Sequence, residues 1–350
     1  MSFLALSPAQ HSAHFITLSS VFFRTALLGA LVCVAIPALA QPAAQAYEPP
    51  RTVYGRPDLQ GTWSNASITT LERNGRYESL TLSDDEIARA TSQHPQNVRL
   101  ATDDNMVAGE LPDGTDLSRG RGYNAFWIDP GTQFGVIDGE YRTSWIVEPA
   151  DGRIPYSEQG EQLRSALRNK NAGSDGPEAR PLAERCISTN MRVGPPMING
   201  LYNNNYEIIQ TEDYVVIRTE MVSHARIVRL NQEHQMDTIK PMFGESVGYW
   251  DGDTLVVETT NFHPLQEEAS ISLSTQGRVL EQFTRVSAEQ ILYEFTVEDP
   301  RYYSQPWHGE ARFLPAAGNV YEFACHEGNY ALGAILGGAR RAELQQELER

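Results

Sequence analysis

The second half of the chain carries a succession of short segments in which apolar and polar residues alternate, and no other feature limits the fold as strongly. Successive side chains of a strand point to opposite faces, so this alternation predicts strands with one buried face. Asp251-Gly252-Asp253 separates two such segments and predicts a hairpin. We therefore predict a mainly β fold, an antiparallel β-barrel or sandwich with a few short peripheral helices. Most of it is expected within 202–325, with strands at 206–210, 214–221, 226–230, 254–259, 279–285, 291–297, 308–313 and 320–325.

The N-terminal region has the pattern of an export signal. Arg24 precedes an apolar run over 25–37, and small residues suited to cleavage follow at Ala38-Leu39-Ala40. A membrane anchor is the alternative, although the run is shorter than the ~20 apolar residues that a spanning helix needs. The sequence predicts a periplasmic or secreted protein with no stable membrane insertion after cleavage. Its expected parts are a signal peptide (1–40), a flexible lead-in (41–57), one β-rich domain (58–338) and a peripheral helical tail (339–350).

Charge and motif content exclude several classes of function. Lys and Arg number 28 against 45 Asp and Glu, a net charge of -17, which argues against a nucleic-acid partner because phosphate contacts need clustered basic residues. The sequence contains no Walker A loop, no GxGxxG, no HExxH and no CxxC. We therefore expect a small-molecule partner and neither a cofactor nor a metal. A weak metal site at His224 with Glu220, or at His326 with Glu327, remains an alternative.

The cysteines predict one disulfide. Signal cleavage would leave only Cys186 and Cys325, and two cysteines in an oxidising compartment most simply pair. A catalytic thiol is the alternative. Near the N-terminal end of the folded part, Ser83 and Glu86 have the spacing of a capping box and predict a helix over 83–93.

One strand segment carries several charged residues at period two. Counted from Tyr214 with unbroken alternation, one face presents Arg218, Glu220, His224 and Arg226. This row is either a solvent-exposed ladder of ion pairs or the polar lining of a ligand cavity inside a barrel. In the second interpretation, Arg218 and Arg226 hold an anionic group or a developing oxyanion.

A second polar group follows Cys325. His326 and Glu327 stand at the end of a strand next to the predicted disulfide, so they are candidates for acid/base chemistry; a packed structural histidine is the alternative. We predict that His326 and His224 lie in one cavity and transfer protons, assisted by Glu327 and Glu220. The substrate would be bound by polar and aromatic residues nearby: Asn204, Tyr206, Trp127, Asn329 and Tyr330.

Several stretches resemble a known group of proteins. Pro57-Asp58-Leu59-Gln60-Gly61-Thr62-Trp63-Ser64-Asn65, the segment 250–262 (WDGDTLVVETTNF) and the segment 325–330 (CHEGNY) are similar to a widespread family of exported bacterial hypothetical proteins. The resemblance implies a common β-rich fold and brings no family activity with it. Gly61-x-Trp63 at the start of a β protein is also lipocalin-like, by fold analogy only.

Together these features lead to a hypothesis about function. We expect an exported, cofactor-independent acid/base enzyme of the lyase, hydratase or hydrolase type. Its substrate would be a small hydroxylated or aromatic molecule in a polar-floored barrel cavity. The alternative is a non-catalytic, lipocalin-like small-molecule-binding protein. Histidines 224 and 326 lying far apart or facing solvent would favour the binding protein, because a carrier needs no adjacent titratable groups.

Overall fold

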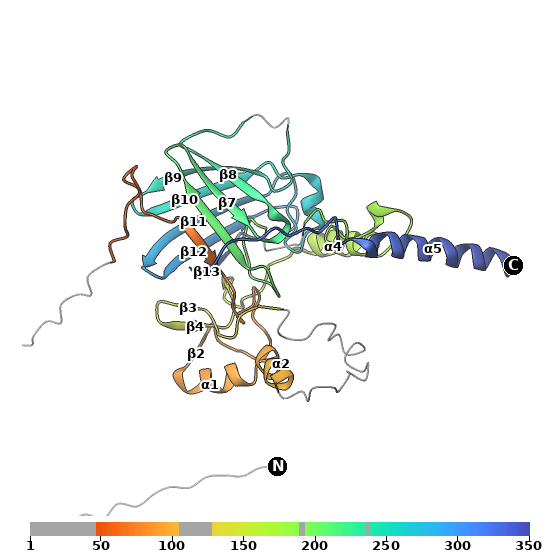
Figure 1. The fold of residues 1–350 in the computed structure, drawn as a ribbon, viewed down its shortest axis with the longest axis horizontal. Helices are drawn as coiled ribbons and strands as arrows, with labels where there is room; N and C mark the ends of the chain where they lie inside the picture. The colour runs from red at the N-terminus through yellow and green to blue at the C-terminus, as the bar shows by residue number, and fades with distance from the viewer. Residues whose placement is uncertain (1–46, 105–127, 189–192, 236–238) are drawn as a thin grey trace, which may run out of the picture. The chain divides into compact units, whose positions relative to one another are not determined.

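The computed structural model describes residues 47–104, 128–188, 193–235 and 239–350, and 47–350 form one compact unit (Figure 1). The segment predicted to be the signal peptide, residues 41–46 of the predicted lead-in, and Trp127 lie outside the described residues. Among the described residues, no helix has the length and apolar character needed to cross a bilayer.

The centre of the molecule is a closed β-barrel of nine strands, so the predicted mainly β fold is confirmed in its barrel form. Strand β1 pairs with both β6 and β13, and this double pairing closes the ring. A short strand, β5 (Ile146–Glu148), adds to β13 outside the ring. The barrel strands are β1 (Gly61–Ser64), β6 (Asn205–Gln210), β7 (Tyr214–Thr219), β8 (Ala225–Leu230), β9 (Glu245–Asp251), β10 (Thr254–Thr260), β11 (Arg278–Ser287), β12 (Gln290–Glu298) and β13 (Trp307–Pro315).

One pair of barrel strands is parallel. All neighbouring strands run antiparallel except β8 and β9, which are joined through 231–244. A ring with an odd number of strands cannot close with alternating directions throughout, so nine strands require a parallel pair. This pair distinguishes the barrel from an up-and-down barrel of the lipocalin type, in which every neighbour is antiparallel.

Aromatic side chains fill much of the barrel interior. In β12 burial alternates along the strand, and Tyr293 and Phe295 are fully buried on the inward face. The Tyr293 ring lies 5.0 Å from that of Phe283 and 5.4 Å from that of Phe313. Gly309 lies opposite Phe295, where a Cβ atom would come within 2.2 Å of the ring, so the glycine makes room for it. This dense packing gives the barrel its core.

Smaller elements surround the barrel. Residues from the N-terminal half of the chain form a three-stranded sheet in the order β2 (Thr81–Leu82), β4 (Glu140–Arg142) and β3 (Val136–Ile137). The described helices are α1 (Asp84–Ser92), α2 (Pro95–Asp104), α4 (Glu158–Lys170) and α5 (Tyr330–Leu348), with short 3-10 turns η2 (Pro177–Ala179), η4 (Met221–Ser223) and η5 (Pro264–Glu268). Helix α1 begins at the predicted capping box, where the backbone N–H of Ser83 donates to Glu86.

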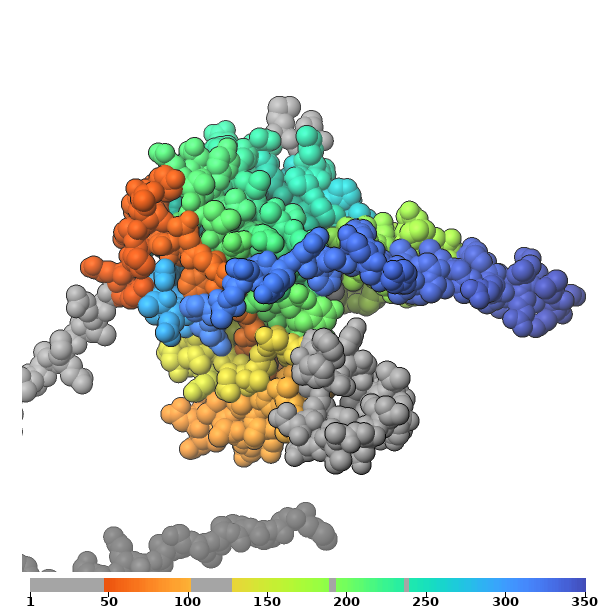
Figure 2. All heavy atoms as spheres, viewed as in Figure 1, coloured from red at the N-terminus to blue at the C-terminus, as the bar shows by residue number. Residues whose placement is uncertain are grey.

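The C-terminal part of the chain first follows the barrel and then leaves it. The segment 316–329 crosses the outer face of β7, where Arg218 donates to the carbonyl oxygen of Val320 (Figure 2). Helix α5 then begins at Tyr330, before the predicted start of the tail at 339, because Asn329 accepts a capping hydrogen bond from the N–H of Leu332. No residue of α5 is buried, so the helix receives little support from the rest of the protein.

Candidate functional site

The predicted polar row on one face between 218 and 226 does not exist. Strand β7 ends at Thr219, and the turn η4 follows with Val222 and Ser223 at positive φ values of 54° and 48°. The turn interrupts the alternation, so the prediction of one shared face was wrong. Arg218 lies on the outer face in an ion pair with Glu207, whereas Arg226 is buried opposite the core residue Ile217.

Arg226 forms a buried ion pair with Glu281 inside the barrel. Tyr293 donates from its hydroxyl to Glu281 at 2.8 Å, and the N–H of Met197 donates to the Tyr293 oxygen at 2.9 Å. Burial lowers the pKa of Arg226, but the adjacent Glu281 carboxylate raises it above its ordinary value. The guanidinium is thus already neutralised by a protein carboxylate, so Arg226 has no unmatched charge to offer to an anionic ligand.

His224 and Glu220 occupy separate environments near the turn. The Glu220 carboxylate is buried and accepts a hydrogen bond of 2.7 Å from the Asn205 side chain. The His224 ring packs on Phe243, with the ring centres 4.2 Å apart. Burial, assisted by the charge of Arg226, lowers the pKa of His224 to about 4. His224 is therefore a neutral imidazole near pH 7 and a weak general base.

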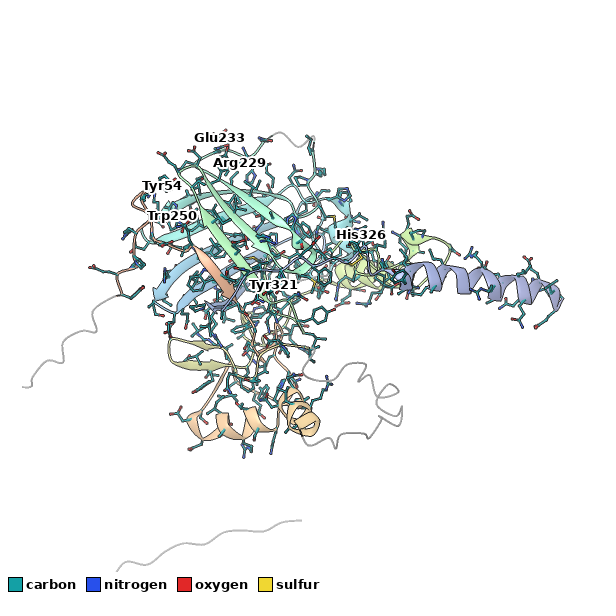
Figure 3. The ribbon with its side chains drawn as sticks, viewed as in Figure 1. Tyr54, Arg229, Glu233, Trp250, Tyr321 and His326 are labelled. Carbon is teal, nitrogen blue, oxygen red and sulfur yellow. A yellow bond between two sulfur atoms is a disulfide. The ribbon has the colours of Figure 1, made fainter. Side chains whose placement is uncertain are left out.

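The group after Cys325 is exposed. The disulfide between Cys186 and Cys325 is present, with the Cα atoms 5.7 Å apart, so this prediction is confirmed. The strand predicted over 320–325 is absent, because the chain there runs without strand pairing and turns at 325–328. His326 lies in this turn on the surface (Figure 3), and its neighbour Glu327 is also exposed. Tyr330 is 83% exposed. None of these side chains, nor that of His224, lines the pocket described below.

Three of the predicted substrate-binding residues have structural partners: Asn204, Tyr206 and Asn329. Asn204 accepts from the N–H of Gly200 and donates to the carbonyl oxygen of Asp129, so it joins two loops. Tyr206 is buried, and its hydroxyl accepts from the side chain of Asn65 at 3.3 Å. Asn329 caps α5 and donates to the carbonyl oxygen of Glu184. Their polar groups are occupied by the fold itself.

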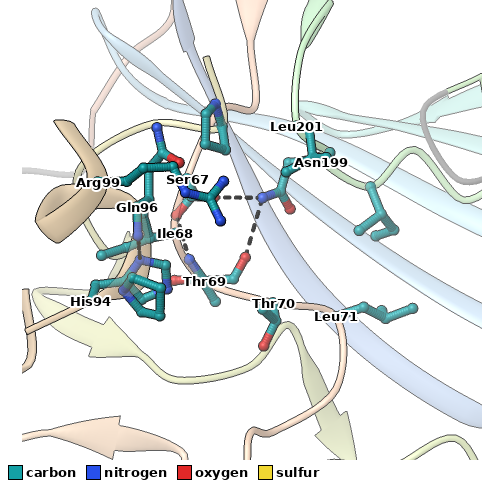
Figure 4. A pocket seen from close by; sticks show the side chains of 14 residues that line it. Ser67, Ile68, Thr69, Thr70, Leu71, His94, Gln96, Arg99, Asn199 and Leu201 are labelled. Atoms are coloured by element: carbon teal, nitrogen blue, oxygen red, sulfur yellow. Dashed lines mark hydrogen bonds between the residues drawn. The ribbon is translucent and has the colours of Figure 1, made fainter. Parts of the chain in front are cut away.

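A pocket of about 340 Å³ lies between three segments that are far apart in the sequence (Figure 4). Residues 67–71 form one wall, 94–99 at the start of α2 form another, and 198–201 form a third. Most of the lining is apolar, with the side chains of Ile68, Leu71, Ile198 and Leu201 contributing. Pockets of roughly 300–1,000 Å³ with mainly apolar walls are typical of small-molecule sites.

Hydrogen bonds fix one polar wall of this pocket. The side-chain amide of Asn199 donates to the carbonyl oxygens of Ser67 at 2.7 Å and Thr69 at 3.2 Å. Its oxygen accepts from the indole N–H of Trp145 at 2.7 Å. Asn199 thus holds the segments 67–71 and 198–201 together, and its own polar atoms are engaged.

Arg99 is the charged residue of this pocket. None of the described residues that line the pocket is Asp or Glu, and the half-buried Arg99 guanidinium forms no hydrogen bond or ion pair with any described residue. Burial lowers the pKa of His94, the other titratable side chain of the lining, so this imidazole is neutral near pH 7. The described part of the pocket therefore combines apolar walls with a positive charge that no described acidic residue balances.

Sequence reasoning missed this pocket. Its walls come from loops and a helix start that have no alternation, and no motif marks 67–71 or 198–201. In comparisons with known proteins, no family model matches the chain and no curated protein is significantly similar to it.

Proposed function

We propose that the protein binds a small, mainly apolar molecule that carries one anionic group, with the apolar part in the pocket and the anion at Arg99. The observation that carries this proposal is the Arg99 guanidinium, which has neither an ion-pair partner nor an acidic pocket neighbour among the residues that the structure describes. A partly buried charge is costly without a partner, and a planar guanidinium matches the two oxygens of a carboxylate.

The placement of the histidines supports a binding protein over an enzyme. His326 faces solvent, and His224 is packed on Phe243 at the η4 turn. A carrier needs shape and one charge contact, and it does not need paired proton donors and acceptors. The pocket walls supply that shape, and Arg99 supplies the charge.

The test compares a ligand with and without its charge. Isothermal titration would measure the affinity of the purified protein for 4-phenylbutyrate, its homologues of different length, and the matching alcohols. We expect carboxylates to bind more tightly than alcohols, and Arg99→Gln to remove about a tenfold preference, the value of one charge-assisted hydrogen bond.

The matched control is Arg89→Gln, which removes the same charge from the exposed surface of α1. It should leave the preference for carboxylates unchanged. Equal effects of the two substitutions, or equal affinity of the intact protein for carboxylates and alcohols, would refute the role of Arg99. The absence of binding by any member of the series would refute the proposal.

A cofactor-independent acid/base enzyme is the second candidate. Its support is His224, a neutral imidazole close enough to Arg226 for that charge to lower its pKa. Such a group donates a hydrogen bond to a developing oxyanion more readily than it removes a proton. A screen of small hydroxylated and aromatic molecules would detect turnover. If turnover is found and His224→Gln leaves it unchanged, His224 takes no part.

We also propose that the chain is exported to the periplasm or beyond the cell. The apolar segment 25–37 and the disulfide between Cys186 and Cys325 support this location. N-terminal sequencing of the protein from a cell-envelope or secreted fraction should find a start after Ala40. Recovery of uncleaved, reduced protein from the cytoplasm alone would contradict export.

A further inference from the structure

Three potential metal ligands converge on the outer surface of β12 and β13. Ligand atoms of Glu294, His308 and Glu310 all lie within 4.8 Å of one another. The strand register explains this convergence, because Glu294 is the direct cross-strand partner of Glu310 and Thr296 is that of His308. All four residues alternate with buried neighbours, so they share the outward face. The cluster therefore belongs to two rigid, paired strands.

Hydrogen bonds to neighbouring residues orient two of the three ligands. The Nδ1 atom of His308 lies 3.2 Å from the Thr296 hydroxyl, and this contact leaves Nε2 as the ring nitrogen for an ion. The largely buried Arg142 donates to Oε2 of Glu310 at 2.9 Å and leaves Oε1 for an ion. Second partners of this kind are typical of metal-bound histidines and carboxylates.

Among the described residues, Arg142 is the cation that forms an ion pair with a carboxylate of the cluster. Two carboxylates directly opposite each other on neighbouring strands repel, which normally destabilises a sheet. Arg142 is shared between Glu310 and Glu140, so it does not balance all of this negative charge. A cation would remove the repulsion.

We propose that Glu294, His308 and Glu310 bind one divalent first-row transition-metal ion, with zinc as the reference probe. One imidazole nitrogen with two carboxylate oxygens suits zinc or manganese better than calcium, which takes oxygen ligands only. Three protein ligands leave coordination positions for water. None of the three residues lines the pocket at Arg99, so this site is independent of the proposed ligand site.

The experiment measures zinc binding directly. Purified protein freed of metal with a chelator would be titrated with zinc by calorimetry, and its melting temperature would be recorded with and without the ion. We expect one site and a higher melting temperature with zinc, because an ion that binds only the folded state stabilises it. His308→Ala and the near-isosteric Glu294→Gln should each weaken binding by about tenfold or more and abolish the rise in melting temperature.

The control is His326→Ala, which removes an exposed histidine beside an exposed glutamate elsewhere on the surface. Zinc affinity should stay at the level of the intact protein. Circular dichroism of the metal-free variants verifies that the barrel has formed. Thr296→Val removes the hydroxyl beside Nδ1 of His308 and keeps all three ligands, so it tests whether this contact orients the imidazole. The proposal is overturned if the intact protein does not bind zinc, or if His308→Ala and Glu294→Gln bind it as tightly as His326→Ala.

Discussion

At the scale of single residues, two arginines of one hairpin have opposite environments. Arg218 and Glu207 form a pair with more than a third of each side chain exposed, whereas Arg226 and Glu281 are 3% and 0% exposed. Exposed pairs contribute about 0–1 kcal/mol, while removing one partner of a buried pair costs roughly 3–5 kcal/mol. The difference comes from the charge that is left buried without a partner.

We therefore predict that Glu281→Gln lowers the free energy of unfolding by about 3–5 kcal/mol. Arg226 would keep its charge in the core, and Tyr293 would lose its carboxylate acceptor. Urea unfolding monitored by tryptophan fluorescence measures the change. Glu207→Gln is the matched control and should cost less than about 1 kcal/mol. Similar losses in the two variants would show that Glu281 does not compensate Arg226.

At the scale of elements, helix α4 is docked through a glycine. Gly160 is buried, and a Cβ atom there would lie 2.1 Å from the carbonyl oxygen of Tyr302. The same carbonyl accepts from the N–H of Ser157, the N-cap of the helix. The start of α4 is thereby held against the segment after β12.

We predict that Gly160→Ala destabilises the protein by about 1–3 kcal/mol, although alanine favours an isolated helix by about 1 kcal/mol. The clash with rigid backbone outweighs the helix propensity. Ser165→Ala, on the exposed side of the same helix, should be neutral or slightly stabilising. Thermal unfolding of both variants measures the difference; a gain in stability from Gly160→Ala would show that α4 is not tightly docked.

Strands and turns with local signals could be predicted from the sequence. The alternation in β12 and the two-residue turn at Gly252-Asp253 gave correct elements, because both depend on neighbours within a few residues. The η4 turn could not be predicted, since a β-branched residue such as Val222 disfavours positive φ. A local and a tertiary contact accompany this conformation: Thr219 donates to the carbonyl oxygen of Met221, and Ser223 accepts from the N–H of Phe323, a hundred residues away.

The candidate pocket also depends on contacts between segments that are distant in the sequence. Asn199 joins Ser67, Thr69 and Trp145, which come from two segments more than fifty residues away in the sequence. No periodicity or motif in the sequence predicts that these segments come into contact. The prediction of one polar face over 218–226 failed for a related reason: Arg226 has its partner on β11, and a period-two count cannot identify a partner on another strand.

At the scale of the whole molecule, the disulfide ties the two ends of the barrel region together. Cys186 precedes most of the barrel strands and Cys325 follows the last, with a sequence separation of 139. A cross-link over a loop of this length restricts the unfolded chain by about 5 kcal/mol in the chain-entropy model.

We predict that the double variant Cys186→Ala, Cys325→Ala loses up to about 5 kcal/mol of unfolding free energy while keeping the barrel. Urea unfolding measures the loss, and far-ultraviolet circular dichroism tests the fold. The intact protein treated with a reductant is the control and should lose a similar amount. Unchanged stability in both samples would show that the cross-link does not limit the unfolded chain.

The pairing of β1 with β13 has a consequence for biosynthesis. The first barrel strand begins at Gly61 and its final neighbour ends at Pro315, so a growing polypeptide cannot close the ring until Pro315 has emerged. Until then, β1 and the newest strand present unpaired backbone groups, which can pair with other chains. A product shortened before residue 307 would carry these edges permanently, and aggregation rather than a smaller barrel is its expected fate.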